Sequence, residues 1–299
     1  NAGDGVNLTT VGSMAAITAL AGIESTANSA FGVAAQNISD DLSLSALARV
    51  NASGNTAGGI NMMAIGVDVA AIGLVADSTA SGNLGTGIQG NIFSPNGTAA
   101  FLALSTDALR PLSPVLGDLL GGAPIEIPGT PYGPVVANNN FGHGIDVDVM
   151  GFDMAIGALL YTSTSGNFAT GADLFLDSID GDTIGAVLSS DLLYDILPDV
   201  IGIPPIAYDA MGPVVADWNL GTGIRIQQSA FIDSTTLLGG IQASDNGGGG
   251  IQATTSAMMG DALAILLETD TDGNMGTGGL NLTVNSLNVY AKQSAGTPF

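Results

Sequence analysis

The sequence lacks cysteine, which excludes disulfide bonds, thiolate metal sites and cysteine nucleophiles. It also has very little positive charge, because four Lys and Arg stand against 27 Asp and Glu and the formal net charge is −23. Nucleic acid is therefore not expected as a partner, since phosphate binding depends on clustered Lys and Arg. Anionic lipid surfaces are disfavoured for the same reason.

Long hydrophobic runs are missing as well. No stretch of about 18 or more residues is continuously apolar, so no transmembrane helix is expected. A basic, apolar leader of the signal-peptide kind is also absent, and Asn1 is interpreted as a processed end if the protein is exported. Because 46% of the residues are hydrophobic and only 10% are charged, the chain can still bury a core. With 44 Gly and 5% aromatic residues, that core must consist of small and aliphatic side chains in a turn-rich fold.

What the chain does contain is an internal repeat, in which Asn stands four residues before Gly. The spacing between successive Asn residues is 27 or 28 residues, apart from two longer intervals that are interpreted as repeats carrying insertions at 106–136 and 190–215. The corner is expected to use Gly for positive φ and the Asn amide for hydrogen bonding. The repeated residues are Asn1, Asn28, Asn55, Asn83, Asn140, Asn167, Asn219, Asn246 and Asn274.

Each repeat predicts two strands joined by a turn. Residues 145–149 alternate between apolar and acidic, which is the period of a half-buried strand. Nineteen residues after each Asn, the second strand is expected to place a column of apolar side chains in the core: Leu20, Leu47, Leu74, Leu102, Leu159, Ala186, Leu238 and Ile265. The expected fold is therefore all-β, a single repeat domain over residues 1–299 that forms a β-solenoid of about nine 27-residue coils.

An up-and-down β-barrel of about 18 strands, with one hairpin per repeat, is the alternative. The repeated Asn favours the solenoid, because each amide can bind the amide of the next coil, whereas barrel loops have no reason to share one side chain. The ladder is expected from Asn28, Asn55, Asn83, Asn140, Asn167, Asn219, Asn246 and Asn274. The low aromatic content also argues against the aromatic girdles of a transmembrane barrel.

The repeat resembles those of β-solenoid surface proteins, namely parallel β-helical adhesins and, more loosely, curli-like extracellular fibre subunits, which carry Gly, Asn and a serine-rich corner. The resemblance covers residues 1 to about 292 and concerns the pattern of the repeats. It implies a structural protein at the cell surface or outside the cell. The inward positions are expected to hold Val, Ile and Leu.

The two insertions resemble each other, since both open with Asp and a Leu-rich run and both rejoin through the sequence GPVVA. They leave the solenoid at the same phase and are interpreted either as lids or as an apolar assembly surface. The candidate assembly residues are Leu116, Leu119, Leu120, Val200 and Ile201. Because the repeat is already in phase at Asn1 and only a short tail follows the last coil, we expect uncapped ends and end-to-end stacking.

The acidic residues suggest three further sites. Two loops offer oxygen ligands with spacings typical of calcium loops: Asp270, Asp272 and Asn274 in one, and Asp177, Asp180 and Asp182 in the other. An outward column is predicted to pair Arg225 with Asp173 and to contain Asp146. Carboxylates at 146, 148, 173 and 177 offer the pairs that a glycosidase needs. Glycan acceptor sequons begin at Asn7, Asn37, Asn51, Asn96 and Asn281.

The sequence as a whole predicts a non-enzymatic, extracellular or cell-surface structural protein that binds copies of itself and forms a filament, sheath or surface fibre. Calcium is the one cofactor that the acidic loops suggest. An outer-membrane β-barrel channel and a carbohydrate-active enzyme on a β-helix are the alternatives.

Overall fold

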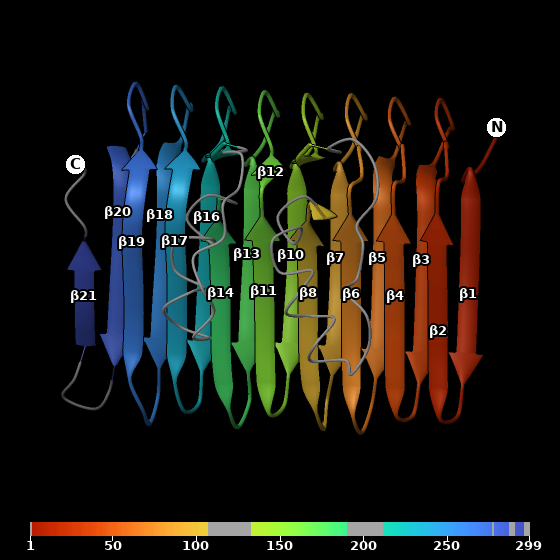
Figure 1. Ribbon diagram of the computed structural model, residues 1–299, viewed down its shortest axis with the longest axis horizontal. Helices are drawn as coiled ribbons and strands as arrows, with labels where there is room; N and C mark the ends of the chain where they lie inside the picture. The colour runs from red at the N-terminus through yellow and green to blue at the C-terminus, as the bar shows by residue number, and fades with distance from the viewer. Residues whose placement is uncertain (1, 107–132, 190–211, 277, 287–290, 296–299) are drawn as a thin grey trace, which may run out of the picture.

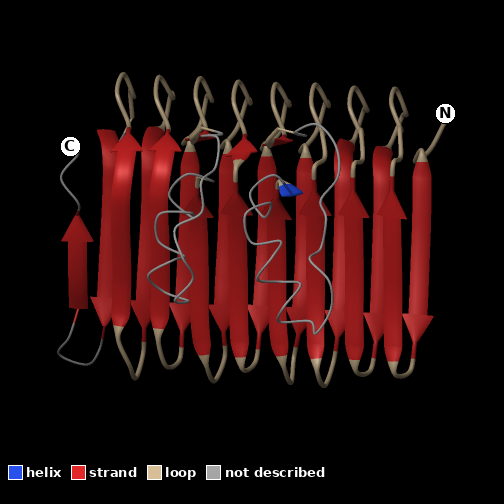
Figure 2. Ribbon diagram, in the orientation of Figure 1, coloured by secondary structure: helices blue, strands red, loops and turns tan. Residues whose placement is uncertain are grey.

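The computed structural model describes residues 2–106, 133–189, 212–276, 278–286 and 291–295. Regular structure in these ranges is almost entirely β-strand, as Figure 2 shows. Successive long strands alternate between two sheets, sheet A and sheet B, which lie against each other along an elongated rod (Figure 1). The two sheets share one continuous hydrophobic core.

Sheet A contains the first strand of every coil. Its strands, in spatial order, are β1 (Val6–Gly12), β3 (Phe31–Ser39), β5 (Gly58–Gly66), β7 (Ile88–Ser94), β10 (Ile145–Gly151), β13 (Ala172–Ser178), β16 (Ile224–Ala230), β18 (Gly249–Ala257) and β20 (Gly278–Ser286). Spatial order follows chain order, so each coil lies directly on the one before it.

Sheet B contains the second strands. They are β2 (Ala15–Ala21), β4 (Leu42–Ala48), β6 (Ala70–Ala76), β8 (Thr98–Leu104), β11 (Met154–Leu160), β14 (Asp182–Leu188), β17 (Ser234–Gln242), β19 (Ala262–Asp270) and β21 (Ala291–Ala295). Three short strands form a narrow third ladder that joins the end of β17: β9 (Val135–Val136), β12 (Thr162–Ser163) and β15 (Val214–Val215).

The pairing of the strands confirms the predicted β-solenoid, which makes about eight turns. Neighbouring strands in the described residues are parallel; Val6 of β1, for example, lies opposite Val33 of β3. The barrel alternative is wrong, because a barrel of hairpins requires consecutive strands to be antiparallel neighbours in one sheet. Here consecutive long strands belong to different sheets.

The apolar column predicted on the second strands is in fact divided between two faces. Leu47 and Leu159 point inward and are fully buried. Leu74 lies opposite Ala46 and therefore points outward, while its neighbour Val75 takes the inward place opposite Leu47. The cause is one extra turn residue between the strands of some coils, because a shift of one residue moves a side chain to the other face of a strand.

Not every inward position is aliphatic, which corrects the expectation of Val, Ile and Leu throughout. Asn37 is fully buried. Its Oδ1 accepts a hydrogen bond from Thr18 Oγ1 at 2.7 Å, and its Nδ2 donates to Ser45 Oγ at 2.9 Å. Gln228 is buried in a later coil and donates from Nε2 to Thr236. The buried amide of Asn37 is thus satisfied at both its oxygen and its nitrogen, whereas Gln228 is bonded through Nε2 alone and its buried Oε1 has no partner.

Candidate functional site

The eight predicted ladder residues, Asn28 to Asn274, lie one above another in a single corner of the solenoid. At each of the seven steps, the backbone N–H and the side-chain Nδ2 of one Asn donate to Oδ1 of the Asn in the next coil, at 2.8 to 3.2 Å. The structure therefore brings all eight residues together. From Asn28 to Asn246 they are at most 5% exposed.

The ladder crosses both insertions without a break. Asn83 donates to Asn140 Oδ1 at 3.0 Å from both nitrogens, although the first insertion lies between them in sequence. Asn167 donates to Asn219 Oδ1 at 2.9 and 3.0 Å across the second. An amide suits this position because it carries both a donor and an acceptor without charge, so the column can repeat in a dry interior.

In all but the last coil, the Gly four residues after each ladder Asn has a different role from the one predicted. Positive φ occurs instead at the residue immediately before the Asn, such as Gly82 (65°) or Asn139 (56°), and only Gly278, after Asn274, has positive φ at the predicted place (96°). In the other coils the repeated Gly is needed for space. A methyl group on Gly144 would lie 2.5 Å from the carbonyl oxygen of Gly171 and 2.7 Å from Asn167 Nδ2. The Asn and Gly therefore recur together because the Gly leaves room for the amide of the next coil.

The outward column of sheet A places Asp146, Asp173 and Arg225 on successive strands. Arg225 Nε donates to Asp173 Oδ1 at 2.7 Å, and Arg225 Nη2 pairs with Asp173 Oδ2. The predicted ion pair is confirmed, and its two-pronged geometry is the stronger kind. The hydrogen bond to Asp173 also raises the pKa of Arg225.

Two carboxylates beside this pair are less easily ionised. Burial raises the pKa of Asp146; His143 opposes that rise and Asp173 adds to it. The pKa of Asp148 is raised by burial and then by the negative charges of Asp146 and Asp173. This part of sheet A therefore combines the ion-paired Asp173 with two neighbouring carboxyl groups, Asp146 and Asp148, whose pKa values are raised.

The third ladder holds an acidic residue that sequence reasoning missed. Asp217 Oδ1 accepts a hydrogen bond from the backbone N–H of Ser244 at 2.6 Å, and Oδ2 accepts one from Gln242 Nε2 at 2.5 Å. Burial raises the pKa of Asp217, against the effect of these two hydrogen bonds. Its position two residues before Asn219 is the signal that could have placed it at the ladder corner.

The structure does not bring the candidate calcium ligands together. Asp182 Oδ1 accepts a hydrogen bond from the backbone of Asp233, and Asp270 Oδ1 accepts one from Asp272. Asn274 Oδ1 accepts from Asn246 within the ladder. Asp177 is the second-last residue of β13, and Asp180 lies exposed in the following turn. Among the residues that the structure describes, no group of three or more His, Cys, Asp or Glu is arranged to hold a metal ion.

The candidate assembly residues of the insertions, Leu116, Leu119, Leu120, Val200 and Ile201, lie outside the described residues. The rejoining GPVVA segments are described, and they place β9 and β15 at the same phase of the third ladder. Of the sequons, Asn37 is buried in the core, whereas Asn7, Asn51, Asn96 and Asn281 are exposed.

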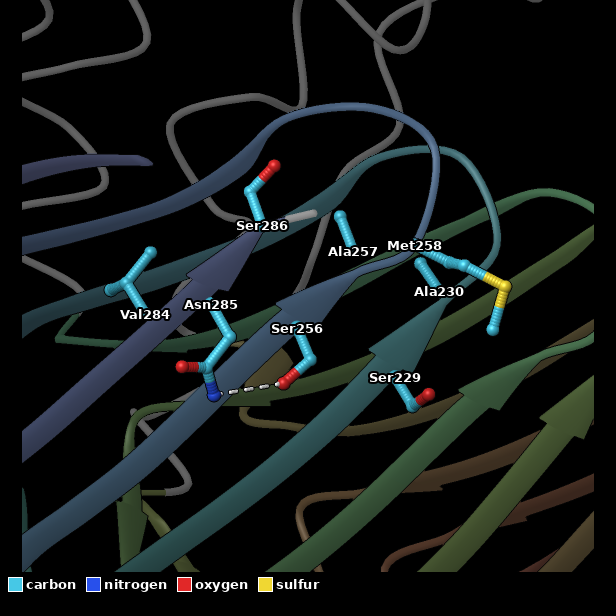
Figure 3. A pocket seen from close by; sticks show the side chains of 8 residues that line it. All are labelled: Ser229, Ala230, Ser256, Ala257, Met258, Val284, Asn285 and Ser286. Carbon is cyan, nitrogen blue, oxygen red and sulfur yellow. Dashed lines mark hydrogen bonds between the residues drawn. The ribbon is translucent and has the colours of Figure 1, made fainter. Parts of the chain in front are cut away.

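A pocket of about 490 Å³ lies where β16, β18 and β20 end (Figure 3). Its polar groups come from Ser229, Ser256, Asn285 and Ser286, and Asn285 Nδ2 donates to Ser256 Oγ at 3.4 Å. Ala257, Met258 and other apolar residues complete the wall. The lining contains hydroxyls and an amide but no ionisable side chain, so it offers no acid or base for catalysis.

The largest feature that sequence reasoning missed is the outer surface of sheet B. We call it the apolar face and define it by three columns of outward side chains from β4 to β19. The columns are Leu44, Ile72, Ala100, Ile156, Ile184, Thr235 and Leu263; Ala46, Leu74, Leu102, Ala158, Ala186, Leu237 and Ile265; and Ala48, Ala76, Leu104, Leu160, Leu188, Gly239 and Leu267. Most are partly exposed, but Ala76, Ala100, Leu104 and Leu188 are buried. The signal was available, since segments such as 70–76 are apolar throughout, which is typical of strands covered on both faces.

Comparisons with protein families, with curated proteins and with solved structures gave no match to this chain. Within the described ranges, no helix has the length and apolar character needed to cross a membrane.

Proposed function

We propose that this chain is an extracellular structural protein whose rods stack end to end into a filament, sheath or surface fibre. The observation that supports this most is the direction of the Asn ladder. Each ladder residue from Asn55 to Asn246 accepts hydrogen bonds on Oδ1 from the Asn of one neighbouring coil and donates N–H groups to the Asn of the other, as Asn140 does. The two ends of such a stack are complementary, and a head-to-tail contact that does not close into a ring produces an open filament.

The end coils carry the same inward side chains as the interior coils. Leu8 of β1 is partly exposed, whereas Ala35, its partner in the next coil, is fully buried. At the other end, Leu280 of β20 is 40% exposed, whereas its partner Ile251 is 1% exposed. A coil stacked on β1 or on β20 would bury these side chains and continue sheet A in register, and a second copy of the chain carries such coils.

Electron microscopy and light scattering on purified protein in plain buffer test the proposal. We expect unbranched filaments and a fibre diffraction spacing of about 4.8 Å along the filament axis, since the strands stack along the rod. Leu8→Asp should prevent elongation by placing a charge on the inward side of β1. Thr9→Asp, on the outward side of the same strand, is the matched control and should still form filaments. Dispersed wild-type monomers at high concentration would overturn the proposal.

A further inference from the structure

The outer surfaces of the two sheets differ in polarity, although one outward register of sheet A is apolar over several strands, with Ile38, Ile65, Phe93 and Met150. At one outward register of sheet A, successive strands carry Asn61, Gln89, Asp146, Asp173 and Arg225. The three columns of the apolar face contain no charged side chain, and Thr235 is their only polar one. Parallel sheets are almost always covered on both faces, and a contiguous apolar patch of more than a few hundred Å² marks an interaction site.

The size of the apolar face matches a specific protein interface. Its strands β4, β6, β8, β11 and β14 are seven residues long, and β17 and β19 extend it on one side. The three columns cover about six residues of each strand, so with strands about 4.8 Å apart and about 3.3 Å per residue the face measures roughly 650 Å². Two such faces would bury roughly 1,300 Å² in total, which lies within the size range of stable interfaces between two proteins.

We propose that the apolar face packs against the same face of a second copy of this chain, so that two solenoids pair laterally through sheet B. The strands run straight and side by side in Figure 1, so the surface offers long regular rows of side chains that can interdigitate with another sheet. A self-complementary patch on one subunit is what a two-fold dimer requires. This pairing goes beyond end-to-end stacking and does not depend on it.

The distribution of charge favours a second copy over a lipid surface. Acidic residues lie in the turns that lead into sheet B, as Asp68, Asp153 and Asp261 do, and therefore at the rim of the face. An anionic membrane would be repelled by a chain with a net charge of −23. Between two copies, the exposed rim charges are screened by salt, whereas the contact between the apolar columns is not. The dimer should consequently become tighter as the ionic strength rises.

Sedimentation equilibrium over a range of protein and salt concentrations tests the pairing, and the Leu8→Asp chain serves where filaments would interfere. We expect a dimer that is strengthened by salt. Ile72→Asp, in the first column of the apolar face, should weaken dimerisation about 100-fold or more, because it buries an unpaired charge. Ile65→Asp is the matched control, since it makes the same change in the same coil on the outer surface of sheet A and should leave the dimer unchanged.

Three results would overturn the pairing. The first is a wild-type chain that is monomeric at every concentration and salt. The second is an Ile72→Asp chain that dimerises as tightly as the wild type. The third is a monomer in which Ile72→Asp lowers thermal stability much more than Ile65→Asp, which would mean that the chain covers this face with its own residues. A wild-type chain that forms the dimer but no filaments would overturn end-to-end stacking alone.

Discussion

Replacing one amide in the middle of the Asn ladder should reveal how much the ladder stabilises the solenoid. Asn140 is fully buried; its Oδ1 accepts hydrogen bonds from two nitrogens of Asn83, and its Nδ2 donates to Asn167 Oδ1 at 3.1 Å. Asn140→Ala leaves two buried donors of Asn83 without their acceptor. Each orphaned buried group costs about 1–3 kcal/mol, so we expect a loss of about 3–5 kcal/mol in the free energy of unfolding.

Asn140→Asp is the more informative change because its effect should depend on pH. A carboxylate can still accept from Asn83, but it places a buried negative charge against Asn167 Oδ1, which is also an acceptor. A protonated carboxyl group restores a donor at that position and imitates the amide. The pKa of the new Asp should therefore be raised in the folded state. Stability should be highest below the unfolded-state pKa of about 3.9 and should be lost as the pH rises through the folded-state value.

Urea unfolding followed by circular dichroism at pH 4 and pH 7 measures both effects. Asn139→Asp is the matched control, because Asn139 is exposed and adjacent and its positive φ is one that Asp also tolerates. We expect Asn140→Asp to be destabilised by several kcal/mol at pH 7 and to recover much of this at pH 4. If Asn140→Asp matches Asn139→Asp at both pH values, the ladder contributes little and the reasoning is refuted.

Three further predictions concern the charges and the corner glycine. Arg225→Gln should lose about 1–3 kcal/mol of stability at pH 7 by leaving the largely buried Asp173 unpaired, and a second change, Asp173→Asn, should restore part of it in a double-mutant cycle. Burial raises the folded-state pKa of Asp146, Asp148 and Asp217, so the protein should be more stable in urea at pH 4.5 than at pH 7. Replacing all three with Asn should reduce that difference in stability. Gly144→Ala should lower the thermal midpoint markedly because its methyl group would overlap the Asn167 amide, whereas Gly3→Ala, with open space around it, should not; equal midpoints would contradict the proposed role of the glycine.

The coil, the ladder and the Arg225–Asp173 register could be predicted from the sequence because each is a nearest-neighbour property. Residues at one phase of a repeat lie about 4.8 Å apart in a parallel stack, so the spacing of Asn83 and Asn140 determines their contact once the insertion is recognised. It was harder to predict from the sequence which side chains of the second strands point inward. Segments such as 154–160 are apolar at nearly every position, and such a strand has no alternation to show which side chains point inward.

Variation in turn length added to that difficulty. Between β3 and β4 two residues form the turn, whereas between β5 and β6 there are three. A fixed offset from the Asn therefore selects Leu47 on the inner face of one coil and Leu74 on the outer face of the next. In most half-buried strands this slip would expose an apolar residue among polar ones. Here both faces of sheet B are apolar, so the fold tolerates this one-residue shift, and the sequence pattern does not reveal it.

The position of the insertions explains how the rod can carry them. Both begin after a strand of sheet B, at the ends of β8 and β14, and both return through β9 and β15 before the ladder corner. The next Asn then meets its predecessor at ordinary hydrogen-bond distance, 3.0 Å for Asn83 and Asn140. Because each coil forms most of its contacts with its immediate neighbours, stability is close to a sum over coils and interfaces. A segment added at this corner leaves those interfaces intact, and its surface can change without altering the register of the stack.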